Sequence, residues 1–331
     1  MSDILQEKST KMIQEQQIKP NKIGNIYYGN GSYTLPALLD DGIYYFKFFP
    51  TRDISEVQSE VAFVDYLINR GASIPRFLNQ NGREVFQSQD SSIVFYASKH
   101  MDGDYNPALS RSLIEEIVTN IAQMHSMAKD FDKSSVTMQK RTDYQRLIDL
   151  YIKTQCDRDQ RGIANCIERT MKIGVQDVPT YPIHSDLYIG NIVTKDGKFR
   201  GFFDFSNLRE SYLEDDLGKF FQSALEANAI SPKDIDSLVK LYEKESGISL
   251  NRDNLYVSTL YCVLERYYKR GLSGYSEERF PNTIQNLLKL GDDLQKWDLG
   301  TSVKSSIIGT FDGRPQVSFF HWIKIKNMIK F

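Results

Sequence analysis

The sequence has few cysteines, no long apolar run and almost no net charge. Three of its 331 residues are cysteines, and no two of them form a C-x-x-C pair, so it indicates neither a disulfide framework nor a zinc site. No apolar run approaches the about 20 residues that a membrane-spanning helix needs. The net charge of −2 and the lack of a long basic run in the first 300 residues indicate no nucleic-acid surface. The N-terminus lacks the pattern of a secretory signal, so we expect a cytoplasmic protein.

The first hundred residues have the pattern of an antiparallel sheet with one inserted helix. Short apolar runs between residues 23 and 49 are separated by glycines, and the "DDG" at 40–42 is a hairpin-turn signal. An amphipathic helix is predicted over 53–71, with Asp53 as its N-cap and Gly71 at its end. Further strands are expected at 73–78, 84–88 and 91–98.

Helical periodicity dominates after residue 100. The strongest pattern runs from 108 to 130, and later helices are predicted at 142–156, 160–173, 215–229, 232–246, 250–270 and 280–296. Strands followed by helices indicate an α+β protein of two lobes. We expect an N-terminal lobe over 1–100 (with an extra polar helix at 1–20), a helical lobe over 101–300 and a C-terminal extension over 301–331.

The stretch 182–207 carries more polar residues than a buried hairpin requires. Asp186 is followed after four residues by Asn191 and thirteen residues later by Asp204, with two short apolar runs and a "DG" turn in between. Phosphoryl transfer needs a carboxylate that orients the attacking hydroxyl, and it needs oxygen ligands for a divalent cation. A lone H-x-D motif would be typical of an ordinary surface hairpin. The H-x-D motif together with Asn191 and Asp204 at this spacing favours a kinase-like site.

These residues resemble the catalytic loop and the metal-binding segment of the aminoglycoside phosphotransferase superfamily. That group includes choline, ethanolamine and type II homoserine kinases and shares its fold with protein kinases. The resemblance covers about residues 22–297 and implies a two-lobed protein-kinase-like fold. It makes Asp186 the catalytic base, Asn191 and Asp204 ligands of Mg²⁺, and His184 and Asp216 structural supports of the loop. Ser185 departs from the pattern, because the family often has glycine or asparagine there.

A kinase-like fold also needs a strand lysine for the phosphates and a helix glutamate that positions it. Lys47 lies within the apolar run "YYFKFF", where alternation places it on the face of Tyr45 and Phe49. Glu60 is its expected partner, and Glu56 is the alternative. A solvent-reaching lysine at a sheet edge is the structural alternative for Lys47.

The loop that covers the phosphates is expected just before this strand. Gly29 and Gly31 allow a close backbone approach to a nucleotide, and Ser32 offers a further donor. The loop is not a G-x-G-x-x-G, and the chain has no P-loop motif. Backbone groups at 98–101 resemble the family's hinge for the adenine base, and His125 is expected to act in helix packing.

The acceptor is expected between the catalytic loop and the later helices. Carboxylates near tyrosines suit a cationic acceptor, whereas an arginine would bind a carboxylate, and an aromatic stripe on a helix is also typical of a core. The candidate acceptor residues are Glu210, Glu214, Asp215, Glu265 and Arg266.

The sequence therefore predicts a phosphotransferase that uses ATP (or GTP) and Mg²⁺ on a hydroxyl of an aminoglycoside, amino alcohol or sugar-like small molecule. A nucleotide-binding pseudokinase-like module is the alternative, and a protein kinase is less favoured. Residues 315–331 mix aromatic side chains with lysines. We favour a role in capping the C-terminal lobe over contact with an anionic membrane surface.

Overall fold

The computed structural model describes residues 2–29, 31–105, 107–136, 138–140, 178–259 and 261–262. The chain separates into two compact units. Unit 1 comprises residues 1–141, 179–216 and 238–249, and unit 2 comprises 142–178, 217–237 and 250–331. The lobe boundary near residue 100 stays a prediction. Within the described part of the chain, no helix is long and apolar enough to cross a membrane.

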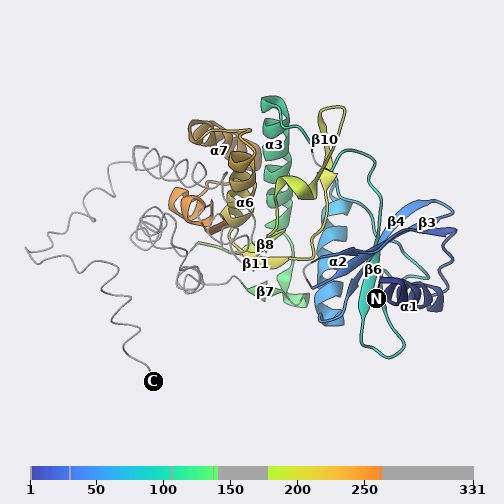
Figure 1. The fold of residues 1–331 in the computed structure, drawn as a ribbon. Coiled ribbons are helices and arrows are strands. Elements are labelled where there is room, and N and C mark those ends of the chain that lie inside the picture. The colour runs from blue at the N-terminus through green and yellow to red at the C-terminus, as the bar shows by residue number, and fades with distance from the viewer. Residues whose placement is uncertain are drawn as a thin grey trace, which may run out of the picture. The chain divides into compact units, whose positions relative to one another are not determined.

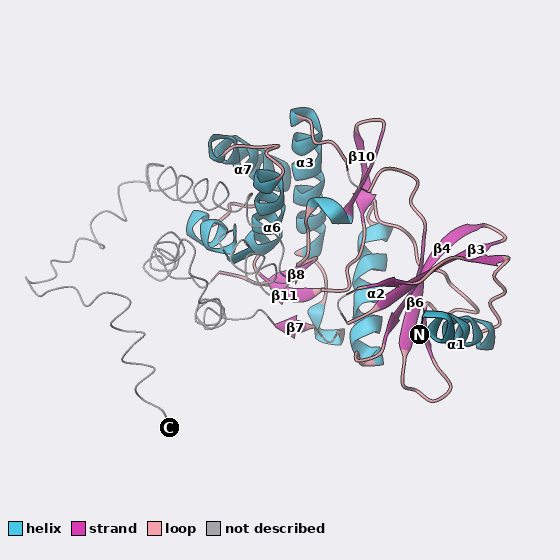
Figure 2. Cartoon of the chain, in the orientation of Figure 1, coloured by secondary structure: helices cyan, strands magenta, loops and turns pink. Residues whose placement is uncertain are grey.

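A six-stranded sheet forms the N-terminal part of unit 1 (Figures 1 and 2). Its order is β1-β3-β4-β6-β5, with β2 paired to β3, and all pairs are antiparallel. The predicted "DDG" turn joins β3 to β4, where Leu39 pairs with Gly42. The strands are β1 (Lys22–Ile23), β2 (Tyr27–Tyr28), β3 (Tyr33–Leu39), β4 (Gly42–Phe49), β5 (Val85–Gln87) and β6 (Val94–Lys99).

Helices cover both faces of this sheet. Helix α1 (Ser2–Glu15) places Met12 and Ile13 in a core with the aromatic side chains of β3, β4 and β6. Helix α2 (Ile54–Asn69) places Val57 and Val61 against the other face (Figure 1). The alternation of β4 decides which side chains enter each layer, because its even-numbered residues face the α1 core and its odd-numbered residues face the other side.

The rest of unit 1 holds the catalytic stretch. Helix α3 (Arg111–Ala128) begins after an N-cap at Ser110, whose hydroxyl accepts the N–H of Leu113. The predicted hairpin is present as β9 (Ile192–Lys195) and β10 (Lys198–Phe202). Asp196 and Gly197 form its turn with φ of 54° and 71°, as a two-residue hairpin turn requires. A three-stranded sheet has the order β7 (Gln139–Lys140), β11 (Arg209–Ser211) and β8 (Tyr181–Ile183).

Two further helices are described, α6 (Leu213–Glu226) and α7 (Pro232–Ser246). In unit 2, helix α6 lies very close to the helical residues 252–259, because a Cβ at Gly218 would lie 2.7 Å from the backbone nitrogen of Thr259. Glycine is therefore required at this crossing.

The predicted α+β fold class is confirmed. The strand expected at 73–78 is wrong, because Pro75 interrupts it and only Phe77 bridges to Ser98. Strands β7, β8 and β11 are too short for the sequence pattern to indicate. The helices predicted at 142–156, 160–173 and 280–296, the end of 250–270 and the extension 315–331 lie outside the described residues.

Candidate active site

Lys47 lies in the centre of the sheet and reaches the segment that carries Asp204. It pairs with Thr34 on β3 and Tyr96 on β6, so it is not at a sheet edge. Its Nζ lies 2.5 Å from Asp204 Oδ1 and donates to Ser206 Oγ at 2.9 Å. Burial raises the pKa of Asp204, but the ammonium of Lys47 outweighs it and lowers this pKa to about 2. Asp204 is therefore ionised at neutral pH.

Glu60 is buried beside Lys47 but forms its ion pair with another residue. Arg52 Nη1 lies 2.7 Å from Glu60 Oε2, and the hydroxyl of Tyr96 donates to Glu60 Oε1 at 2.7 Å. Among the described residues, Glu60 thus forms its ion pair with Arg52, and Lys47 forms its ion pair with Asp204. Arg52 also donates to the carbonyl of Ser206 at 3.2 Å. Burial raises the pKa of Glu60, although Arg52 opposes this effect.

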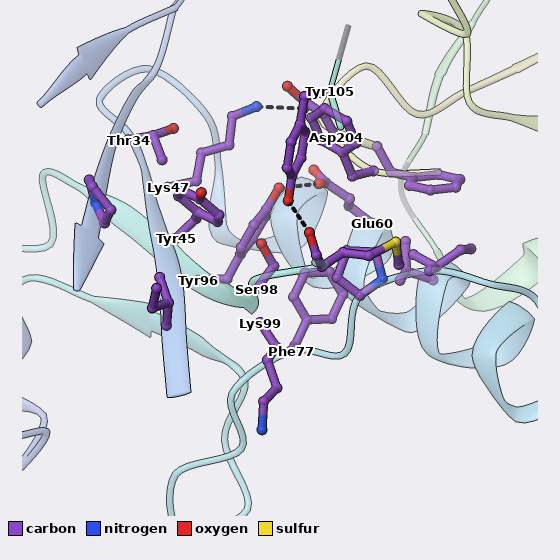
Figure 3. A pocket seen from close by; sticks show the side chains of 18 of the residues that line it. Thr34, Tyr45, Lys47, Glu60, Phe77, Tyr96, Ser98, Lys99, Tyr105 and Asp204 are labelled. Carbon is purple, nitrogen blue, oxygen red and sulfur yellow. Dashed lines mark hydrogen bonds and ion pairs between the residues drawn. The ribbon is translucent and has the colours of Figure 1, made fainter. Parts of the chain in front are cut away.

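A pocket of about 690 Å³ lies against this network. Figure 3 shows Lys47 and Asp204 at its polar end and Tyr96 directed toward Glu60. Lys99 and Met101, from the predicted hinge, also line it. Its remaining lining is mostly apolar and aromatic, and it includes Pro36, Ile43, Tyr45, Val64, Phe77, Tyr105 and Phe203. Such a pocket suits a flat heterocyclic base whose charged substituent points toward Lys47.

The predicted catalytic loop is held in part by two of its own side chains, those of Asn191 and His184. Asn191 Nδ2 donates to the carbonyl of Asp186 at 2.9 Å and lies 3.5 Å from Asp186 Oδ2. His184 Nδ1 accepts the N–H of Asp186 at 3.3 Å, so its Nε2 carries the proton that is donated to the carbonyl of Phe203 at 2.9 Å. His184 thus links the loop to the segment that carries Asp204, and its supporting role in catalysis stays a prediction.

Asp216 lies beneath the loop with a fully buried carboxylate. Its Oδ2 accepts the N–H of His184 at 2.9 Å, and its Oδ1 accepts the N–H of Ser185 at 2.6 Å. Burial raises the pKa of Asp216. The hydrogen bond and the electrostatic interaction with His125 outweigh burial, so the pKa is lowered. His125 Nε2 lies 3.1 Å from Asp216 Oδ2, and its Nδ1 lies 2.8 Å from the hydroxyl of Tyr242.

The two predicted metal ligands lie on adjacent backbone segments. The N–H of Phe203 donates to the carbonyl of Asn191 at 3.1 Å, which brings Asn191 next to Asp204. The amide nitrogen of Asn191 is used within the loop, so its oxygen is the atom that a cation would contact. A carboxylate and an amide oxygen fit Mg²⁺, which takes few protein ligands and completes its shell with phosphate and water. Among the described residues, no three His, Cys, Asp or Glu side chains form a metal cluster.

The predicted phosphate loop is a tight turn between β2 and β3. The N–H of Gly29 donates to the carbonyl of Ser32 at 2.8 Å, and Gly31 has a φ of 73°. Tyr27 and Thr34, on either side of the turn, line the pocket. Gly29, Gly31 and Ser32 are absent from this lining, and their phosphate-binding role stays a prediction.

The predicted acceptor carboxylates have other contacts in the structure. Glu210 Oε1 accepts from Lys133 Nζ at 2.5 Å and from the hydroxyl of Thr180 at 2.8 Å. Asp215 accepts from the hydroxyl of Ser211, and Glu214 is only 5% exposed. Glu265 and Arg266 lie outside the described residues. The acceptor assignments stay predictions.

Several residues of this network were not identified from the sequence, among them Tyr242, which contacts His125. Arg52 and Tyr96 bind Glu60, Ser206 binds both Lys47 and Asp204, and Arg209 donates to Ser185. Ser206 could have been identified from the sequence pattern, since it lies two residues after Asp204. The others depend on pairing between strands and helices that no local motif encodes.

The chain matches a known protein family over more than half of its length. The model of the phosphotransferase enzyme family (APH) matches residues 37–243. No curated protein matches the sequence at a significant level.

Solved structures share the fold at low sequence identity. The complex of amicoumacin kinase hAmiN with AMP-PNP, Ca²⁺ and Ami is 14% identical over 88% of this chain and 96% of that chain, with a TM-score of 0.62. Spectinomycin phosphotransferase in complex with ADP and spectinomycin is 11% identical over 88% and 98%, with a TM-score of 0.61. The GDP complex of aminoglycoside 2'-phosphotransferase-IIIa is 13% identical over 87% and 99%, with a TM-score of 0.58. Because the family model covers more than half of the chain, the protein belongs to the phosphotransferase enzyme family and is a small-molecule kinase.

Proposed function

We propose that the protein transfers the γ-phosphoryl group of ATP, with GTP as the alternative donor, to a hydroxyl group of a small molecule. The observation that carries this proposal is the ion pair of Lys47 with Asp204, which brings the phosphate-binding lysine and the metal aspartate to one end of the pocket. The complexes of similar structures with AMP-PNP, ADP or GDP support a nucleotide in this pocket.

In this proposal each group at the polar end of the pocket has one role. Lys47 binds the phosphates, and Asn191 and Asp204 hold Mg²⁺, which when bound neutralises charge on the phosphate oxygens. Lys47 exchanges its bond with Asp204 for the phosphates as the nucleotide enters. Arg52 and Tyr96 hold Glu60 in place beside Lys47, and both oppose the rise that burial causes in its pKa.

Asp186 is the proposed general base. Its carboxylate orients the acceptor hydroxyl and takes its proton as the phosphoryl group is transferred. The loop is fixed from both sides, by Asn191 on the Asp186 carbonyl and by His184 on the Asp186 N–H. A base held in this way accelerates the reaction mainly because it is already oriented toward the acceptor hydroxyl.

We propose an amino-bearing or sugar-like alcohol as the acceptor. Similar structures contain amicoumacin ("Ami") and spectinomycin as their small molecules. The ion pair with Lys133 already neutralises much of the charge of Glu210, and Glu214 is buried, so the partly exposed Asp215 is the better candidate for contact with a cationic group.

A phosphate-transfer screen with ATP or GTP, Mg²⁺ and a panel of aminoglycosides, amino alcohols, homoserine and simple sugars tests the proposal. We expect phosphorylation of at least one alcohol by the wild type. The Asp186→Ala variant should lose turnover by about 10²–10⁴-fold while it still shows a thermal shift with ATP and Mg²⁺. Binding of nucleotide without transfer to any acceptor would favour the pseudokinase-like alternative. Unchanged turnover in Asp186→Ala would reject the base.

A further inference from the structure

Ser185, directly before the proposed base, has a backbone conformation that serine seldom adopts. Its φ is +68°, in the left-handed region where glycine and asparagine are preferred and a Cβ is unfavourable. Its N–H donates to Asp216 at 2.6 Å, which fixes one side of the residue. Since φ and ψ of Ser185 set the direction of the next residue, the same conformation determines where Asp186 points.

Arg209 binds the other side of Ser185. Arg209 Nε lies 2.5 Å from Ser185 Oγ, and Arg209 Nη2 lies 3.4 Å from the Ser185 carbonyl. The strand register explains this reach, because Arg209 on β11 pairs with Ile183 at the end of β8. Its side chain then needs to extend past only one residue to reach the loop. Ser185 is 9% exposed, so water does not readily replace these bonds.

We propose that Arg209 is a positioning residue for the catalytic loop, and that it compensates for serine at a position suited to glycine. The bond to Ser185 Oγ and the longer contact to the Ser185 carbonyl hold this residue in the left-handed conformation that directs Asp186. The inference rests on the proposed role of Asp186 and assigns a function to the departure at 185. Arg209 acts through Ser185 and does not contact the acceptor.

A double-mutant cycle tests the inference. With serine at 185, Arg209→Ala should lower kcat about tenfold or more, because a small displacement of the base is costly, while KM for ATP stays unchanged. With Ser185→Gly in place, the same change should lower kcat by less than about twofold, because glycine adopts the required φ unaided. Ser185→Ala keeps the Cβ and loses the hydroxyl, so it should not rescue Arg209→Ala. Arg200→Ala, an exposed arginine on β10, is the matched control.

Two outcomes would overturn the positioning role. An equal loss of kcat with serine and with glycine at 185, together with a raised KM for the acceptor, would assign Arg209 to acceptor binding. Full activity of Arg209→Ala would show that the contact has no role. If Arg209→Ala does not fold, Ser185→Ala carries the test alone, and wild-type kcat in that variant would reject the inference.

A readout without turnover separates this inference from the proposed function. Hydrogen exchange of the segment 181–191 should become faster in Arg209→Ala and return toward the wild-type rate in Arg209→Ala with Ser185→Gly. If the wild type phosphorylates no acceptor, the proposed function fails while this exchange pattern still reports on the positioning contact. If transfer occurs but exchange is the same in all variants, only the positioning role fails.

Discussion

The ammonium of Lys47 lies 2.5 Å from a carboxylate oxygen of Asp204, a residue 157 positions later in the chain. The contact joins the middle strand of the sheet to the segment after β10. The hydroxyl of Ser206 accepts a hydrogen bond from the same ammonium and donates one to the same carboxylate oxygen. Ser206 therefore contacts both members of the ion pair. This arrangement keeps Asp204 ionised in a largely apolar pocket.

Replacement of Lys47 by methionine should remove both effects. The pKa of Asp204 should rise from about 2, because burial then acts without an opposing cation. The nucleotide phosphates would lose their cation, so we expect kcat/KM for ATP to fall by about 100-fold or more. Steady-state kinetics at saturating acceptor measures this change. Lys195→Met is the control, since Lys195 forms an exposed pair with Asp102. An equal loss in both variants would contradict a specific role for Lys47.

Replacement of Arg52 by alanine should lower the free energy of unfolding of the protein. We expect little direct effect on contacts with the nucleotide. Glu60 is 0% exposed, and without Arg52 its buried charge lacks an ion pair. Loss of one partner of such a pair costs about 3–5 kcal/mol, which chemical unfolding would detect. Lys99→Ala, which breaks the exposed pair with Asp41, should cost less than about 1 kcal/mol.

The coupling between Arg52 and Glu60 can be isolated. In a Glu60→Gln background there is no buried charge to leave unpaired, so Arg52→Ala should cost much less than in the wild type. An equal cost in both backgrounds would show that Arg52 stabilises through its other contacts, which include Phe49 at 4.8 Å, Glu56 and the carbonyl of Ser206, and not through Glu60.

The sequence predicted the hairpin of the stretch 182–207 well because its geometry is local. His184, Asp186, Asn191 and Asp204 lie within 21 consecutive residues, and a two-residue turn fixes how the two segments meet. Strand alternation likewise placed Lys47 on the face of Tyr45, where both line the pocket. These inferences needed only the period of a strand and the geometry of a turn.

The partner of Glu60 was not predictable in the same way. The resemblance suggested Lys47 as the partner. The observed partner is Arg52, which lies eight residues before Glu60 in the loop that precedes α2. Tyr96 reaches Glu60 only because β6 pairs with β4 in a register that sets Tyr96 opposite Lys47. Arg209 required the pairing of β11 with β8, two strands too short to show a periodic pattern. Contacts of this kind follow from tertiary pairing, which a single sequence does not specify.

Replacement of Asp65 by asparagine should change how stability depends on pH. Burial, together with Glu84, raises the pKa of Asp65 to about 7, although Arg76 opposes the shift. The folded state thus binds this proton more tightly than the unfolded state, whose carboxyl has the ordinary value of 3.8. The stability from Asp65 is complete below about pH 4 and is lost as the pH rises to about 7.

Asp65→Asn removes this loss, because the amide does not ionise. At pH 8 the variant should unfold at a temperature about 2–4 °C higher than the wild type, which corresponds to about 1 kcal/mol after solvent screening. At pH 5 the two should differ little. Glu7→Gln, which replaces an exposed carboxylate on α1, is the control. A Tm difference that is the same at pH 5 and pH 8 would contradict a raised pKa of Asp65.

Changes in the buried chain Asp216, His125 and Tyr242 should lower activity in a graded order. Asp216→Asn is the most severe, since one amide oxygen cannot replace two carboxylate oxygens that accept the N–H groups of His184 and Ser185. We expect about a 100-fold loss of kcat from displacement of Asp186, with KM for ATP little changed. His125→Ala should cost less, and Tyr242→Phe, which loses only the hydroxyl 2.8 Å from His125 Nδ1, should cost least.

The pH dependence of Asp216→Asn gives an independent check. The pKa of Asp216 is lowered below 3.8, so this carboxylate contributes stability above about pH 4 that is lost as the pH falls through its folded pKa. The wild type should therefore be more stable than Asp216→Asn at pH 7, and the difference should shrink below pH 4. Unfolding by urea at several pH values measures it. A difference that stays constant down to pH 3 would mean that Asp216 stabilises the loop through packing alone and not as an ionised acceptor.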